Sequence, residues 1–146
     1  MVDNNRWYET KDGDLAARGI FNRHYSRHWY KDGRRRKLFI GPGEKMVLVL
    51  SDYSALFVWR KFISGDGQEG INCAIFRNES EYLSSELILE AEELAIRRWG
   101  KQRLYTYVNS KKINSSNPGY CFQKAGWKKC GETKVNRLII LEKILE

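Results

Sequence analysis

The sequence predicts a single α+β domain built around a mixed β-sheet. Three strand-like runs, 46–50, 55–62 and 71–76, follow one another and are rich in Val, Leu, Ile and aromatic residues. Asp, Ser and Gly residues separate them, which is typical of an antiparallel meander. A helical pattern joins the third run to a fourth at 104–108, and such a unit predicts a crossover between parallel strands. With 146 residues, 42% of them apolar, the chain is expected to form one domain, 1–146, with its own core.

A helix is expected before the meander. Asp12 or Asp14 can cap its N-terminus, because aspartate accepts hydrogen bonds from the first free amides of a helix. Apolar residues at helical spacing then extend it from Leu15 to about His24. A loop follows and ends near Gly41-Pro42-Gly43, a strong turn signal.

The crossover helix has the clearest boundaries. Ser84 or Ser85 begins it and Gly100 closes it, as expected for residues that start and end helices. Acidic residues gather early and basic residues late, which suits the helix dipole. Its apolar face is made by Leu87, Ala91, Leu94 and Ala95.

A short helix and a strand pair are expected at the C-terminus. Asn117-Pro118 is predicted to cap the short helix, with Pro at its first position, and Gly126 lies just past its end. The runs 127–130 and 138–144 are then expected to pair as antiparallel strands around Gly131.

The stretch 23–37 is the strongest functional signal. It holds seven Lys or Arg residues, both histidines of the chain and three aromatic residues, and the whole chain carries a formal charge of +8. Cations attract phosphates, and interleaved rings offer surfaces on which an unstacked base can lie. A solvated basic face is the alternative. We expect DNA as the partner, with phosphate contacts from Arg27, Lys31, Arg34, Arg35, Arg36 and Lys37.

Several other classes are not expected. No run of 18 apolar residues and no apolar leader segment are present, so the sequence favours a cytoplasmic protein without a membrane partner. Cys73, Cys121 and Cys130 are widely spaced, which favours reduced thiols over a disulfide frame. Only two histidines, His24 and His28, are present, so neither a metal site nor a Cys-His hydrolase is expected.

The order of elements resembles the GNAT acetyltransferase fold. The segment 122–127, Phe-Gln-Lys-Ala-Gly-Trp, is similar to the Tyr-x-x-x-Gly-Phe-like pattern with which that family ends its short helix. The resemblance implies acetyl-CoA or a related acyl donor. Two departures are visible: no glycine occurs in 77–85, where the family places its pyrophosphate loop, and Phe122 stands where the family has a proton-donating tyrosine.

A narrower resemblance is to phage Mom-type proteins, which are GNAT-like and modify adenine in DNA. The matching segments are 24–26, 76–78, 104–109 and 117–120. The resemblance implies that Tyr25, Arg77, Asn109 and Tyr120 are active-site residues. His24 is added because an imidazole can relay a proton near neutral pH, and Ser26 belongs to the matching segment. Residues that hold the donor are expected where the GNAT family binds it, at the end of the third strand and the start of the crossover helix. The catalytic candidates are His24, Tyr25, Ser26, Arg77, Asn109 and Tyr120, and the donor-binding candidates are Asn78, Ser84 and Ser85.

The predicted function is therefore a GNAT-like transferase that adds an acyl-derived group to a base, adenine, in DNA. Such an enzyme must take the base out of the stack before it can react. Tyr25, Trp29 and Tyr30 are suited to stack on it. A GNAT acetyltransferase of a protein or small-molecule amine is one alternative, and a non-catalytic nucleic-acid-binding module is the other.

Overall fold

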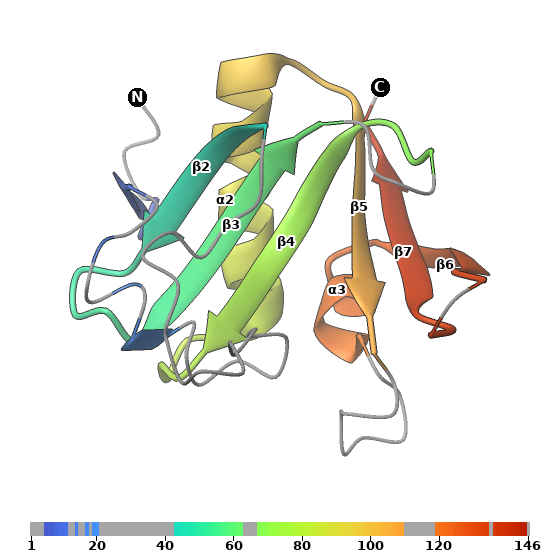
Figure 1. Ribbon diagram of the computed structural model, residues 1–146. Coiled ribbons are helices and arrows are strands. Elements are labelled where there is room, and N and C mark those ends of the chain that lie inside the picture. The colour runs from blue at the N-terminus through green and yellow to red at the C-terminus, as the bar shows by residue number, and fades with distance from the viewer. Residues whose placement is uncertain are drawn as a thin grey trace, which may run out of the picture.

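The computed structural model (Figure 1) describes residues 5–11, 14, 17, 19–20, 43–62, 67–109, 119–134 and 136–145. These residues form a seven-stranded mixed sheet in the order β1-β2-β3-β4-β5-β7-β6, with two helices, α2 and α3. The α+β class predicted from the sequence is confirmed. No helix in the described ranges is long and apolar enough to cross a membrane.

The predicted meander is present. Strands β2 (Glu44–Val49), β3 (Ala55–Lys61) and β4 (Ile71–Asn78) pair antiparallel in sequence order. A further strand, β1 (Tyr8–Thr10), pairs antiparallel with β2 and forms one edge of the sheet. Strand β1 is not predicted from the sequence, because three residues are too few to show an alternating pattern.

The crossover is also present. Helix α2 (Ser84–Trp99) joins β4 to β5 (Arg103–Val108), and these two strands are parallel. The helix begins at Ser84 and ends at Gly100, as predicted, and Gly100 has a φ of 80°. A positive φ is readily adopted only by glycine, which explains why the helix stops there.

The C-terminal part confirms the strand pair and corrects two details. Strands β6 (Lys128–Glu132) and β7 (Ile139–Ile144) are antiparallel, but Gly131 lies inside β6 rather than in the turn. Helix α3 (Tyr120–Lys124) begins after Gly119, so Pro118 is not its first residue. The left-handed conformation of Gly119, with φ 80°, sets this boundary.

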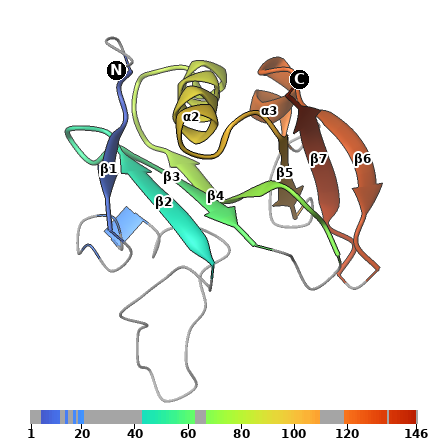
Figure 2. The same cartoon turned by 90° about the horizontal axis from the view of Figure 1, so that it is seen from above.

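Both helices cover the same face of the sheet (Figure 2). The main core lies between them and the strands, and includes Trp59, Leu87, Ala91, Leu104 and Trp127. A second cluster on the opposite face joins β2, β3 and β4 to the apolar residues Ala17 and Ile20. The side chain of Asp14 accepts a hydrogen bond from the Ala17 amide at 2.9 Å, which confirms the predicted cap. Ala17, Gly19 and Ile20 are helical, and the rest of the predicted N-terminal helix lies outside the described residues.

Candidate functional site at the diverging ends of β4 and β5

Strands β4 and β5 pair over only part of their length. Their register comprises three residue pairs, from Ile71 with Leu104 to Cys73 with Thr106. Beyond these pairs β4 continues to Asn78 and β5 to Val108, and the two strands separate (Figure 1). In open sheets, ligands bind beyond the carboxyl ends of neighbouring parallel strands. The wide end of this wedge is therefore the candidate site.

Helix α3 closes the wedge on the helical face. The Phe76 ring of β4 meets the Phe122 ring of α3 edge-on, with centroids 5.9 Å apart. Phe122 is buried and also contacts Trp127, at 4.9 Å between centroids. Phe122 is thus a core side chain.

A bulge decides which face each residue at the end of β4 presents. Val58 pairs with Ile75 and Trp59 with Cys73, so Ala74 is the extra residue. As a result Arg77 pairs with Leu56, a residue of the core cluster on the face opposite the helices. Side chains alternate along a strand, so Asn78 is directed towards α2.

Asn78 organises the loop from β4 to α2. Its Nδ2 donates to the Tyr82 carbonyl at 2.8 Å and to Ser84 Oγ at 3.0 Å. Its Oδ1 accepts from the Ser80 amide at 2.9 Å. Asn78 and Ser84, two of the predicted donor-binding residues, are therefore brought together, and their polar atoms shape the loop.

The N-terminus of α2 opens at the same end of the sheet. Leu83 is the cap residue, and it supplies no side-chain cap. The first bond within the helix runs from the Leu87 amide to the Leu83 carbonyl, at 3.1 Å. The amides of Ser84, Ser85 and Glu86 precede that bond, and such amides, together with the helix dipole, attract anions.

Ion pairs surround this helix end. Arg77 Nε lies 2.6 Å from Glu79 Oε2. This ion pair offsets the charge of Glu79, but it also engages the arginine that was predicted to orient a donor. On the other side Arg6 pairs with Glu86 at 3.2 Å and with Glu90. Two arginines thus pair with three glutamates, so they offset only part of the acidic charge near the N-terminus of α2.

Asn109 and Tyr120 each follow a residue of one close contact, between Val108 and Gly119. A Cβ on Gly119 would lie 2.6 Å from Leu141 Cδ1 and 3.3 Å from Val108 Cγ2, so only glycine allows this close approach. Asn109 follows Val108 directly and Tyr120 follows Gly119 directly, so both residues flank one contact. Tyr120 is the first residue of α3 and its side chain is 55% exposed.

The described part of the predicted site thus falls into two groups. Asn78, Ser84 and Ser85 lie at the start of α2, and Asn109 and Tyr120 lie at the end of β5 and the start of α3. Arg77 is on the opposite face of the sheet. The other predicted residues lie outside the described ranges: His24, Tyr25, Ser26, Arg27, Lys31, Arg34, Arg35, Arg36 and Lys37.

A buried charged pair was not anticipated. Glu92 of α2 is 4% exposed. One of its carboxylate oxygens accepts from Trp127 Nε1 at 2.9 Å, and the other lies 2.7 Å from Lys143 Nζ. Burial raises the pKa of Glu92, and the Lys143 and Trp127 contacts partly oppose that shift. The helical spacing of Ile88, Glu92 and Ala95 places all three on one side of α2. The sequence therefore indicated that Glu92 shares the apolar face of the helix.

No group of three potential metal ligands occurs in the described ranges. No protein-family model matches the chain, and no curated protein is significantly similar to it in sequence.

Proposed function

We propose that this protein is a GNAT-like transferase that adds an acyl-derived group to adenine in DNA. The observation that carries the proposal is the wedge between β4 and β5, beside the N-terminus of α2, which has no side-chain cap. The order of elements is the order that the family resemblance implies. A wedge of this kind admits an extended donor, and free amides attract its phosphates.

Acetyl-CoA or a related acyl donor would supply the activated group. Backbone amides of Ser84 and Ser85 take the part of the missing glycine loop, because amide donors at a helix end do not depend on side-chain identity. Tyr120 is suited to protonate the leaving thiolate of the acyl donor at the wide end of the wedge. Asn109 is suited to orient the adenine amine through hydrogen bonds. Arg77 lies on the opposite face of the sheet from the amides of Ser84 and Ser85, so its proposed part is on that side of the wedge, where Glu79 pairs with it.

DNA as the acceptor rests on charge. The chain carries +8, and the stretch 23–37 holds seven cations interleaved with aromatic residues. Phosphate contacts provide affinity that does not depend on sequence, and the rings provide surfaces for a base removed from the stack.

The deciding experiment is expression in bacteria that carry a plasmid, followed by digestion of the purified plasmid to nucleosides and mass spectrometry. A nucleoside heavier than deoxyadenosine is expected, and its added mass identifies the transferred group. Tyr25→Phe and Arg77→Ala should abolish the new nucleoside and leave DNA affinity within a few-fold. Tyr8→Phe, an exposed tyrosine on β1, is the matched control and should keep full activity. Unchanged nucleosides from cells that contain the folded protein would refute base modification.

Two observations favour a second candidate, a non-catalytic nucleic-acid-binding module. Phe122 fills the family's tyrosine position with a core ring, and Arg77 is engaged by Glu79. Under this reading the triple change of Arg34, Arg35 and Arg36 to Ala abolishes DNA binding, whereas Tyr25→Phe has no effect. Unchanged nucleosides together with acetyl-CoA binding would instead indicate the amine acetyltransferase.

A further inference from the structure

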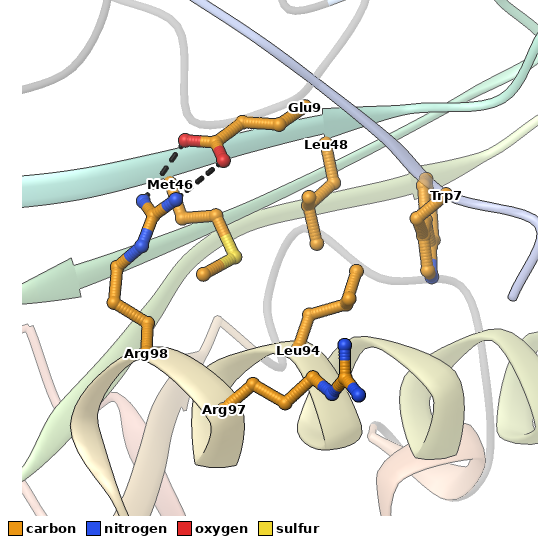
Figure 3. Close-up of a pocket in the computed structure, with 7 residues that line it drawn as sticks. All are labelled: Trp7, Glu9, Met46, Leu48, Leu94, Arg97 and Arg98. Atoms are coloured by element: carbon orange, nitrogen blue, oxygen red, sulfur yellow. Dashed lines mark hydrogen bonds and ion pairs between the residues drawn. The ribbon is translucent and has the colours of Figure 1, made fainter. Parts of the chain in front are cut away.

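A pocket of about 300 Å³ lies between the edge of the sheet and the C-terminal half of α2 (Figure 3). Strands β1 and β2 form one wall and the helix forms the other. Four apolar and three charged residues line it: Trp7, Met46, Leu48 and Leu94, with Glu9, Arg97 and Arg98. Leu94 lies ten residues along α2 from Ser84, which is about 15 Å along the helix axis. The pocket is therefore separate from the candidate transferase site.

The apolar part of the pocket is held in place by the core. Trp7 Nε1 donates to the Leu87 carbonyl at 2.8 Å, and the Trp7 ring meets Phe57 edge-on at 6.0 Å. Met46 and Leu48 belong to β2, which is paired on both sides by β1 and β3. An apolar ligand would enter a largely preformed cavity, and this reduces the ordering cost of binding.

Among the residues that line the pocket, the charges are unbalanced by one. Arg98 donates two hydrogen bonds to the Glu9 carboxylate, at 2.9 and 2.5 Å, so these two charges cancel. Arg97 has no carboxylate partner among the residues that the structure describes. In Figure 3 its side chain runs beside Leu94, with the guanidinium on the Trp7 side of the pocket. The pocket therefore combines apolar walls with one uncompensated guanidinium.

We propose that this pocket binds a small amphipathic monocarboxylate, with its apolar body on Trp7, Met46, Leu48 and Leu94 and its carboxylate on Arg97. The volume is at the lower end of the range for small-molecule sites, which favours a small ligand. A ligand with one negative charge would neutralise the charge of Arg97, whereas a phosphate dianion would leave a net negative charge in the pocket. The planar fork of arginine also matches a carboxylate.

The test is a titration of the full-length protein, labelled with nitrogen-15, with sodium octanoate, followed by NMR. Shifts are expected at the Trp7 indole and at the amides of Leu94 and Arg97. A dissociation constant of about 1 mM is expected for a ligand of this size. Acetate has the charge without the apolar body and 1-octanol has the body without the charge, so both should bind more weakly.

Two variants test whether Arg97 binds the carboxylate of the ligand. Arg97→Gln removes the guanidinium and should weaken octanoate binding by about fivefold while leaving 1-octanol binding unchanged. Lys101→Gln removes the same charge from an exposed residue just past the end of α2 that does not line the pocket, and it should leave octanoate binding unchanged. Equal weakening by both variants, shifts centred elsewhere, or octanol binding as tight as octanoate would overturn the proposal.

A variant that fills the pocket provides an independent test. Leu94→Phe enlarges a half-buried side chain on the pocket wall and should reduce the binding of both octanoate and 1-octanol. Circular dichroism confirms that each variant is folded. Unchanged octanoate affinity in folded Leu94→Phe would also refute the assignment.

Discussion

The edge-on contact between Phe76 of β4 and Phe122 of α3 closes the wedge between the diverging strands on the helical face, with an interplanar angle of 82°. Both rings belong to the main core or pack against it. The contact links the end of β4 to the helix that carries Tyr120, so it connects the two halves of the candidate site.

This contact predicts a measurable coupling. Phe76→Leu, Phe122→Leu and the double variant should show a coupling free energy of about 0.5–1.5 kcal/mol, as for other edge-on aromatic pairs. Urea denaturation of the four proteins provides it. The control pairs Phe122→Leu with Val47→Ala, which belongs to the core cluster on the other face of the sheet, and those two effects should add. A coupling as large in the control would show that Phe122 acts through the general stability of the fold.

Gly119 should be more sensitive to substitution than a glycine of similar conformation. Gly119 and Gly67 have φ values of 80° and 83°, but only at Gly119 would a Cβ meet neighbours, with Leu141 Cδ1 at 2.6 Å. Gly119→Ala should therefore lower the free energy of unfolding by about 1–3 kcal/mol more than Gly67→Ala, because it adds overpacking to the same backbone strain. Chemical denaturation measures both. Equal losses would mean that the end of the Leu141 side chain, or α3 itself, moves aside at little cost.

The three cysteines should differ in reactivity. Cys130 is exposed and Cys73 is buried. Burial raises the pKa of Cys73 and, less strongly, that of Cys121. Since the thiolate is the reactive form, iodoacetamide should alkylate Cys130 in the native protein and Cys73 only after unfolding. Peptide mass spectrometry with and without denaturant shows the order. Rapid labelling of Cys73 in native protein would indicate that the sheet opens between β4 and β5.

Patterns along the chain predicted the elements that are long or sharply bounded. The strand and helix starts from β3 to β5 lie within one residue of those observed, because buried runs and Gly100 mark them clearly. The short elements were missed or shifted. Strand β1 has only three residues, and the start of α3 depends on the left-handed Gly119 rather than on Pro118.

The candidate site was predictable only in part. Parallel strands place their carboxyl ends at one edge of the sheet, so the sequence pattern was sufficient to bring Arg77 and Asn109 to the same end. The bulge at Ala74 depends on how β4 packs against β3, and no residue type signals it. For that reason the sequence could not show that Arg77 is directed to the face opposite α2, or that Glu79 pairs with it.

Glu92 should make the free energy of unfolding fall as pH rises, which is opposite to the usual effect of a carboxylate. Burial raises its pKa in the folded protein above the ordinary value of 4.5, so the folded state holds this proton more tightly than the unfolded state. Between the two pKa values the folded state binds more protons, and linkage then requires stability to fall as pH rises through that window. Above the folded pKa the buried carboxylate is ionised, and its desolvation is only partly offset by Lys143 and Trp127.

The test compares Glu92→Gln with Glu93→Gln across this window. Glutamine keeps the size and a hydrogen-bonding group at position 92 but does not titrate, so the stability of Glu92→Gln relative to the parent should rise with pH from below 4.5 upwards. Glu93 is the exposed neighbour on α2, and Glu93→Gln should run parallel to the parent. Urea unfolding at each pH measures the differences. A constant offset between Glu92→Gln and the parent would mean that Lys143 and Trp127 fully compensate the burial, so that Glu92 titrates alike in the folded and unfolded chains.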